Sequence, residues 1–338
     1  MKIYSKEELN NYNQSLTYDD ISLVPTEISR FKSRSECESK STFLGHELVL
    51  PVFSSPMDSV TGVRMAKALS EYGCIGIVNR FDSSLDEILD DSENVNNIKA
   101  VSVGLQTKLE EIERFAERKL LICIDTANAN NLAVLRKCEE IKAKMDVKLI
   151  VGNIAHGATL TDLVNAGADA VRIGIGGGSM CTTSIQTGIG IGQVSSLLNV
   201  FFEREKQNVK IELIADGGIK SAGDVAKAIA LGADIVMLGR MLAGTKETPG
   251  EVIKYNDQLW KKYRGSASFG VKMKGEFVEG EETMVPYKGL VGNIINNIHD
   301  GLRSSMSYMN KNSIDELKST DTFALLSNSS YLERLPRK

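Results

Sequence analysis

Short runs of consecutive apolar residues recur along the chain, separated by stretches in which apolar positions repeat with a helical period. Runs that are apolar at nearly every position are typical of parallel strands buried on both faces. Eight such runs predict strands over Pro51–Ser54, Cys74–Val78, Ala100–Val103, Leu120–Asp125, Lys148–Gly152, Ala170–Gly174, Ile211–Asp216 and Ile235–Gly239.

The stretches between these runs predict amphipathic helices. Residues Thr61–Tyr72 place three apolar side chains on one face, and Lys108–Arg118 repeats the pattern. The repeated signals Gly167-Ala168-Asp169 and Gly232-Ala233-Asp234 end a helix and lead into the next strand. These units predict an α/β fold, a single (β/α)8 (TIM) barrel over residues 1–338 with short N- and C-terminal extensions. A doubly wound open sheet is the alternative.

The composition fits such a barrel and excludes several classes of protein. Of the 338 residues, 42% are hydrophobic, which is enough for a large core. A formal net charge of −4, without a long Lys/Arg run, argues against nucleic acid as a partner. The N-terminus lacks an apolar signal region and no stretch approaches a membrane span, so we expect a cytoplasmic protein with no membrane partner. Five widely spaced cysteines without a CxxC pair predict neither disulfides nor a zinc site.

Polar and glycine-rich residues follow the ends of the predicted strands. In a (β/α)8 barrel, functional residues lie in the loops after the carboxyl ends of the strands. Glycine-rich turns after the last two strands are the expected phosphate site. Each glycine pair alone could be a tight turn, but their placement on one rim favours a ligand site. The rim residues are Ser55, Met57, Asn79, Asp125, Asn153, Asp216–Gly218, Gly239 and Arg240.

The most distinctive loop is Gly174–Thr183, in which four glycines precede a serine and a cysteine is followed by two threonines. Glycines let the backbone adopt positive φ angles and approach a ligand closely. Successive free amides in such turns form an anion-binding nest, so Ser179 and these amides predict a phosphate cradle. Cys181 then lies where its thiolate can attack the same ligand. The alternative is a structural loop that carries an inert cysteine.

Several motifs together resemble those of the IMP dehydrogenase/GMP reductase family. They occur in collinear order between about Leu16 and Tyr308, and they are Ser54–Val60, the Cys181 loop, Asp216–Gly218, Met237–Gly239, Tyr263–Gly265 and Val285–Gly289. The resemblance implies a (β/α)8 enzyme, usually a homotetramer, that binds a purine nucleoside monophosphate beside a nicotinamide cofactor. It also implies a covalent bond between Cys181 and C2 of the purine.

Within that family, the layout is closest to GMP reductase. Residues Arg80–Val101 contain no inserted regulatory domain of the kind that most dehydrogenases carry there. Lys32–Glu36, Asp125–Asn128 and Gln186–Gly188 resemble reductase patterns. Dehydrogenases have a mobile flap with an Arg-Tyr pair that helps to activate water, and Ser266–Val278 contains neither residue. The resemblance therefore implies NAD(P)H-dependent conversion of GMP to IMP and ammonia, with a flap-like insertion at about 264–289.

Other features depart from the reductase pattern. Leu16–Asp20, Tyr263–Gly265 and Val285–Gly289 read more like dehydrogenases, and Gly177 and Ser184 replace a proline and an arginine of the family loop. The resemblance implies NADPH as the cofactor. Glu276 stands where reductases have an arginine that holds the NADPH 2′-phosphate, and because a carboxylate repels a phosphate, NADH is the alternative. IMP dehydrogenase, or an enzyme of a deoxy or modified purine nucleotide, is the alternative activity. A flavin-dependent barrel oxidoreductase and a non-catalytic nucleotide-binding protein stay open.

The resemblance also implies roles for single residues. Cys181 is the nucleophile, and Thr183 with Glu279 transfers a proton at the leaving group, although Glu279 could instead belong to an acidic surface run. Asp216 is expected to accept both ribose hydroxyls with its two carboxylate oxygens. The expected nucleotide contacts are Ser55, Met57, Ser179, Asp216, Gly217, Gly218, Gly239, Arg240, Tyr263, Ser266 and Ala267. The expected cofactor contacts are Asp125, Thr126 and Asn153, with Asp125 as a helix cap the alternative. K⁺ is expected on the backbone carbonyls of Gly176, Gly178 and Cys181.

Overall fold

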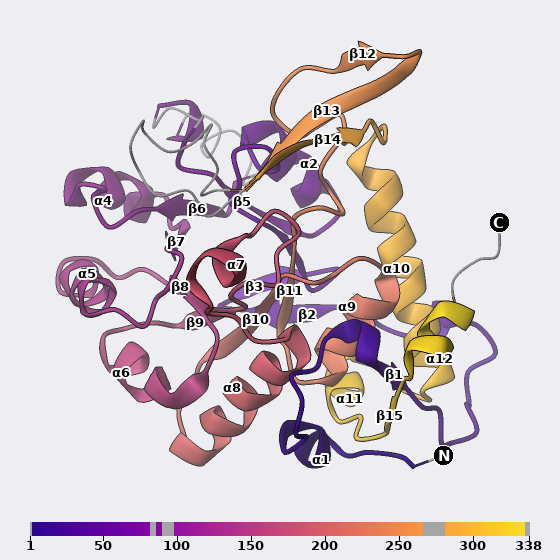
Figure 1. Ribbon diagram of the computed structural model, residues 1–338. Coiled ribbons are helices and arrows are strands. Elements are labelled where there is room, and N and C mark those ends of the chain that lie inside the picture. The colour runs from indigo at the N-terminus through magenta and orange to yellow at the C-terminus, as the bar shows by residue number, and fades with distance from the viewer. Residues whose placement is uncertain (1, 82–85, 90–97, 266–280, 335–338) are drawn as a thin grey trace.

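Eight parallel strands close into a barrel in the computed structural model, which describes residues 2–81, 86–89, 98–265 and 281–334. Around the barrel the strands follow chain order and β11 pairs with β4 (Figure 1). This closure confirms the predicted (β/α)8 fold and excludes the open sheet. The barrel strands are β4 (Val52–Ser54), β5 (Ile75–Val78), β6 (Ala100–Val103), β7 (Leu121–Asp125), β8 (Leu149–Ile154), β9 (Ala170–Ile173), β10 (Glu212–Asp216) and β11 (Ile235–Leu238).

Helices form the outer ring of the barrel (Figure 1). Each buries an apolar face against the strands, as Val63, Ala66 and Leu69 do in the first of them. The helices of this ring are α2 (Val63–Glu71), α4 (Leu109–Glu117), α5 (Leu132–Lys142), α6 (Leu160–Asn165), α8 (Gln193–Gln207), α9 (Ala222–Ala230) and α10 (Val291–Tyr308). Among the residues that the structure describes, no helix has the length and apolarity needed to cross a membrane.

The barrel interior is filled by apolar side chains and closed at its N-terminal end. A hairpin of β2 (Ser41–Phe43) and β3 (His46–Leu48) forms the plug at that end. The ring of Phe43 packs edge-to-face on Phe53 of β4, with the ring centroids 5.1 Å apart. Within the described residues, this hairpin closes the end of the barrel at which the strands begin.

The two Gly-Ala-Asp repeats join neighbouring strands at the closed end. The backbone N–H of Asp169 donates to the carbonyl of Leu149, and the Leu149 N–H donates to the Asp169 carboxylate, each at 2.9 Å. Asp234 makes the same pair of bonds with Leu213, each at 2.8 Å. Each aspartate therefore satisfies a backbone donor at or next to the start of the preceding strand.

Further elements decorate the barrel. Near the two ends of the chain, β1 (Ile21–Leu23) pairs antiparallel with β15 (Phe323–Leu325). After β11, the strands β12 (Ile253–Tyr255), β13 (Gln258–Arg264) and β14 (Glu282–Pro286) form a separate sheet that projects from the barrel in Figure 1. In this sheet β13 pairs with both β12 and β14. Of the flap-like insertion expected at about 264–289, residues 266–280 lie outside the described residues. The remaining elements are α1 (Lys6–Asn10), η1 (Tyr18–Asp20), η2 (Arg34–Glu36), η3 (Gly157–Thr159), α7 (Thr183–Thr187), α11 (Ile314–Lys318) and α12 (Asn328–Glu333).

Candidate active site

A cavity of about 600 Å³ opens at the carboxyl ends of the barrel strands. Its volume lies in the range of about 300–1,000 Å³ that is usual for small-molecule sites. Of the rim residues, Asn79 does not line the cavity, because it is buried and its amide donates to the Thr61 carbonyl. The cavity brings together all the described residues with an expected catalytic or binding role: Ser55, Met57, Asp125, Thr126, Asn153, Gly176, Gly178, Ser179, Cys181, Thr183, Asp216, Gly217, Gly218, Gly239, Arg240 and Tyr263. The other three candidates, Ser266, Ala267 and Glu279, lie outside the described residues.

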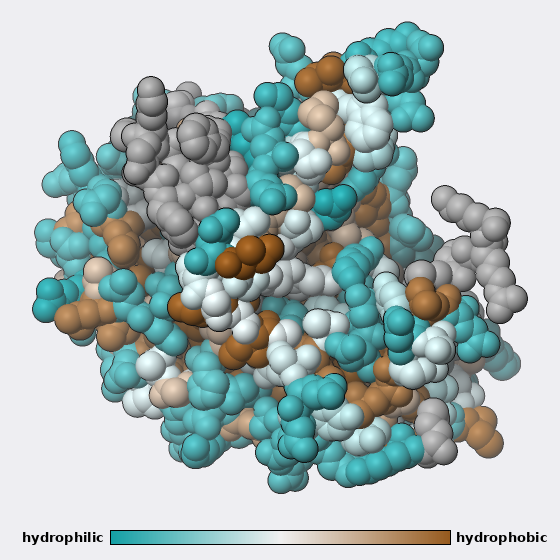
Figure 2. Space-filling model, in the orientation of Figure 1, coloured by the Kyte–Doolittle hydropathy of each residue, from teal (hydrophilic) through white to brown (hydrophobic). Residues whose placement is uncertain are grey.

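The surface beside the cavity is less polar than its surroundings. In Figure 2 hydrophilic side chains cover most of the periphery, while pale and brown residues gather near the centre of the face, around α7. Ile185 of α7 is 81% exposed and Ile189, just after it, is 57% exposed. The loop that carries Cys181 therefore continues into a short helix whose apolar side chains are largely exposed.

Cys181 differs from the other cysteines in its surroundings. It is partly exposed, whereas the other four cysteines of the chain are buried. Burial raises the pKa of the thiols of Cys74, Cys123 and Cys138 to about 12, so these three stay protonated and unreactive. The thiol of Cys181 lies within the cavity, where a ligand can reach it. Of the five cysteines, it is the one placed to act as a nucleophile.

The loop geometry sets the thiol next to a hydroxyl. The Cys181 Sγ donates to Thr183 Oγ1 at 3.2 Å, and the backbone N–H of Cys181 donates to the Gly178 carbonyl at 3.0 Å. Gly174 has a φ of 142°, and a Cβ at this position would overlap the backbone oxygen of Asp216. Only glycine lets the Cys181 loop and the loop after β10 meet this closely. The cysteine and the Asp216 carboxylate thereby face one cavity.

Two hydroxyls and the glycine-rich turns that are expected to hold a phosphate lie together in the cavity. The Ser179 hydroxyl and the Tyr263 phenol are hydrogen-bonded at 3.1 Å, although they lie on the Cys181 loop and on β13. Burial raises the pKa of the Tyr263 phenol, so it is neutral and can donate to an anion. The backbone of Gly217 and Gly218 lines the same cavity. These groups supply the donors that a phosphate needs.

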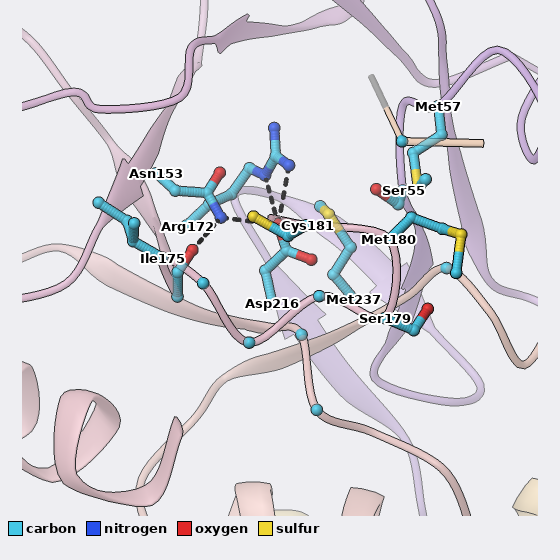
Figure 3. A pocket seen from close by; sticks show the side chains of 18 of the residues that line it. Ser55, Met57, Asn153, Arg172, Ile175, Ser179, Met180, Cys181, Asp216 and Met237 are labelled. Atoms are coloured by element: carbon cyan, nitrogen blue, oxygen red, sulfur yellow. Dashed lines mark hydrogen bonds and ion pairs between the residues drawn. The ribbon is translucent and has the colours of Figure 1, made fainter. Parts of the chain in front are cut away.

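At the opposite side of the cavity lies a network of carboxylates around one guanidinium. Asp216 Oδ2 accepts hydrogen bonds from Arg172 Nη2 at 2.8 Å, Arg172 Nε at 3.2 Å and Asn153 Nδ2 at 2.9 Å. Figure 3 shows Arg172, Asn153 and Asp216 converging beside Cys181. Within the described chain no hydrogen bond reaches Asp216 Oδ1. Protein donors thus gather on Oδ2, and the expectation that both oxygens accept ribose hydroxyls stays a prediction.

Two residues expected to bind the cofactor, Asn153 and Thr126, form hydrogen bonds within the protein. The Asn153 amide, expected to bind the cofactor, donates to Asp216 and to the Gly174 carbonyl at 2.8 Å. The Thr126 hydroxyl donates to the Gly152 carbonyl at 3.0 Å. Both residues still line the cavity. In this structure their side chains hold the Gly174 and Gly152 carbonyls and the Asp216 carboxylate in place.

The sequence reasoning missed two arginines of the cavity. Arg172 Nη1 lies 2.6 Å from Asp125 Oδ1, and Arg80 Nε lies 3.9 Å from Asp125 Oδ2. The sequence did contain a signal for Arg172. It lies two residues after Ala170 in an apolar strand, so the two side chains share a face, and Ala170 faces the barrel interior. A buried cation requires anionic partners, and the aspartates at the neighbouring strand ends supply them.

The sequence matches the IMP dehydrogenase / GMP reductase domain over residues 15–337. The chain belongs to the IMP dehydrogenase/GMP reductase family. It is 35% identical to the GMP reductase of Lactobacillus delbrueckii subsp. bulgaricus over 323 positions, covering 93% of this chain and 96% of the relative. It is 31% identical to the inosine-5′-monophosphate dehydrogenase of Borreliella burgdorferi over 393 positions, covering 96% of both chains. The dehydrogenase of Cryptosporidium parvum is 33% identical, with 96% of this chain and 95% of that protein covered.

Membership of the IMP dehydrogenase/GMP reductase family makes this protein an oxidoreductase that acts on purine nucleotides. Relatives of both activities match at similar identity, so the overall comparison does not choose between the two activities. Both dehydrogenases are covered over at least 95% of their length, as the reductase is. The comparisons therefore span nearly the whole of each relative, whichever of the two activities it has.

Proposed function

We propose that this protein is a GMP reductase, which converts GMP to IMP and ammonia with NADPH or NADH. The observation that carries the proposal is the Cys181 thiol, held 3.2 Å from the Thr183 hydroxyl in a cavity that also contains the hydroxyls of Ser179 and Tyr263. The choice of reductase is supported by the sequence of Ser266–Val278, which contains neither arginine nor tyrosine. Without such a group to activate water, hydrolysis of a covalent purine intermediate is slow.

The cavity is suited to two ribose-bearing ligands. Asp216 and Asp125 lie at the ends of β10 and β7, and each has a carboxylate oxygen that can accept a hydroxyl. Asp216 is the nearer of the two to the phosphate cradle in chain order, because Gly217 and Gly218 follow it directly. In the proposal the nucleotide ribose binds Asp216 and the cofactor ribose binds Asp125 beside Thr126. The reduced nicotinamide, when bound, supplies the hydride.

The residues of the chain perform the remaining chemistry. The Cys181 thiolate attacks C2 of the purine to form a C–S bond, while a ring nitrogen takes up a proton. Thr183, with Glu279, delivers a proton to the 2-amino group, and the C2–N bond breaks to release ammonia. After C2 has accepted the hydride, the C–S bond breaks, Cys181 leaves as the thiolate, and the ring nitrogen gives up the proton that it took up in the first step. The sum is GMP, reduced cofactor and one proton giving IMP, oxidised cofactor and ammonia.

Two further features are proposed on the family resemblance alone. K⁺ binds the backbone carbonyls of Gly176, Gly178 and Cys181, and the protein assembles as a homotetramer. Within the described residues, no cluster of three His, Cys, Asp or Glu side chains could hold a metal ion. Any cation at the loop is therefore expected to use backbone oxygens.

The test of the proposed function is an assay of both directions of the family chemistry. GMP with NADPH or NADH should yield IMP and ammonia, followed by the loss of reduced-cofactor absorbance. IMP with NAD⁺ should yield little XMP, because the water-activating pair is missing. XMP formation without GMP reduction would overturn the proposal in favour of a dehydrogenase, an activity shared by relatives that align over 96% of this chain. Replacing GMP by dGMP shows whether the deoxynucleotide is the preferred substrate.

A further inference from the structure

Arg172 is a buried cation at the point where the barrel core meets the cavity. It lies on β9 and is 5% exposed. Its inward-pointing neighbours on the layer below, including Cys123, Ile150 and Ala170, belong to the apolar interior. The two flanking carboxylates outweigh the effect of burial and raise the pKa of Arg172 well above its ordinary value, so the guanidinium remains charged.

The guanidinium reaches carboxylates on both sides of its strand. Nη1 lies 2.6 Å from Asp125 Oδ1 on β7, and Nη2 lies 2.8 Å from Asp216 Oδ2 on β10. The side chains of Asp125 and Asp216 are 11% and 15% exposed, so water screens these pairs only weakly. The planar fork of arginine suits this task, since separate N–H groups point to separate acceptors.

The contact between Arg172 and Asp125 spans the intervening strand β8, and Gly152 makes room for it. On the inner face of the barrel, Asp125 pairs with Gly152 and Gly152 pairs with Arg172. Gly152 thus lies between the arginine and the aspartate that it contacts. A Cβ at position 152 would overlap the Cβ of Arg172, and the absence of a side chain lets the arginine cross β8 to reach β7. The position of the Arg172 side chain therefore depends on a glycine at position 152.

We propose that Arg172 is a positioning residue that couples the two ligand sites, because one guanidinium orients both the carboxylate that binds the nucleotide ribose and the carboxylate that binds the cofactor ribose. The assignment of a ligand to each carboxylate rests on the proposed function. Arg172 touches neither ligand in this account and acts through Asp125 and Asp216. A change at one carboxylate alters the anchoring of the guanidinium and thereby affects the other site.

The first test replaces Arg172 by lysine, which keeps the charge but has a single ammonium in place of the fork. Binding of GMP alone, and of NADPH and NADH to the GMP-saturated protein, is measured by calorimetry in a Cys181→Ala background, where no turnover occurs. We expect Arg172→Lys to raise the Kd of both ligands roughly tenfold, which corresponds to the loss of about one oriented charged hydrogen bond at each site. Gly152→Ala should produce the same double loss, since it displaces the arginine without altering its chemistry.

The matched control is Arg204→Lys, which alters an Arg–Asp pair at the closed end of the barrel, where Arg204 lies 3.5 Å from Asp234. It should lower the melting temperature and leave both Kd values unchanged. If Arg172→Lys leaves either Kd unchanged while the parent binds both ligands, the inference is wrong. If the parent binds neither GMP nor cofactor, the proposed function is wrong instead, and the two failures are distinguishable.

The second test separates coupling from a merely structural role. Asp125→Asn removes the charge at the cofactor carboxylate, and the Kd of GMP is measured with no cofactor present. Because Arg172 loses one of its two anchors, we expect the GMP Kd to rise about threefold or more, within the range of coupling between residues of one network. In the Arg172→Lys background the same substitution should have no further effect on GMP binding. An unchanged GMP affinity in Asp125→Asn overturns the coupling.

Discussion

The two ends of the barrel both carry aspartates bound to basic side chains, but only one end leaves an oxygen for a ligand. At the closed end, Asp234 accepts the Leu213 N–H at 2.8 Å and pairs with Lys318 at 2.5 Å and Arg204 at 3.5 Å. Asp169 is similarly occupied by two lysines and the Leu149 N–H. At the open end, the protein's hydrogen bonds to Asp216 all fall on Oδ2.

The difference shows how one residue type serves stability at one end and binding at the other. An aspartate before a strand can satisfy the unpaired backbone donors of the neighbouring strand and needs no ligand. An aspartate after a strand has no such donors beside it, so side chains must hold it, as Arg172 and Asn153 hold Asp216. Changes at the open end should therefore alter activity, and changes at the closed end should alter stability.

The largest expected effect is at the open end. Cys181→Ala removes the nucleophile, and we expect turnover of GMP to fall by at least about 10³-fold, because binding contacts alone do not form the covalent bond. The melting temperature should stay the same, since Cys181 is partly exposed. Steady-state kinetics and thermal melting measure both quantities.

The control for this change is Cys138→Ala, which alters a buried cysteine on α5. It should lower the melting temperature and leave turnover per folded molecule unchanged. A Cys138→Ala variant without activity, together with an active Cys181→Ala variant, would remove the basis for placing the chemistry in the loop.

The next prediction compares one substitution at the closed end of the barrel with one at the open end. Asp234→Asn at the closed end removes the charge that pairs with Lys318 and Arg204, and should reduce the free energy of unfolding by about 1–3 kcal/mol while the KM for GMP is unchanged. Ser179→Ala at the open end should raise that KM about tenfold, the value of one hydrogen bond to a phosphate, without changing stability. Denaturant melts and KM values check the pair, and an effect of Asp234→Asn on KM would contradict the division between the ends.

The order of strands and the place of the cavity were predictable from the sequence, whereas the connections across the site were not. Apolar runs and Gly-Ala-Asp signals are local patterns, so they indicated all eight strands. The glycine-rich loop indicated Cys181 for the same reason. The link from Arg172 over Gly152 to Asp125 depends on the register of three strands, and no local pattern specifies that register. The sharing of Asp216 Oδ2 likewise depends on side chains from three strands.

The smallest expected effect concerns pH at the closed end. Burial, with Asp234 nearby, raises the pKa of Glu212 to about 7, while Lys318 and Arg204 oppose the shift. In the unfolded chain a glutamate has a pKa of about 4.3. Between about pH 4.3 and pH 7 the folded state therefore binds more protons than the unfolded state, and stability falls as the pH rises through this window. Above about pH 7 the loss is complete, because Glu212 is then ionised in both states.

Glu212→Gln removes this titration while keeping the shape of the side chain. The excess stability of the variant over the parent should be larger at about pH 8 than at about pH 5 by on the order of 1 kcal/mol, a figure reduced from the full pKa difference because Glu212 is only partly buried. Melting temperatures at the two pH values measure the difference, and Glu205→Gln, at an exposed position on α8, is the control. A stability difference between Glu212→Gln and the parent that is equal at both pH values would show that Glu212 does not titrate in this window. Activity should be unaffected in either case, since Glu212 begins β10 at the end opposite to Asp216.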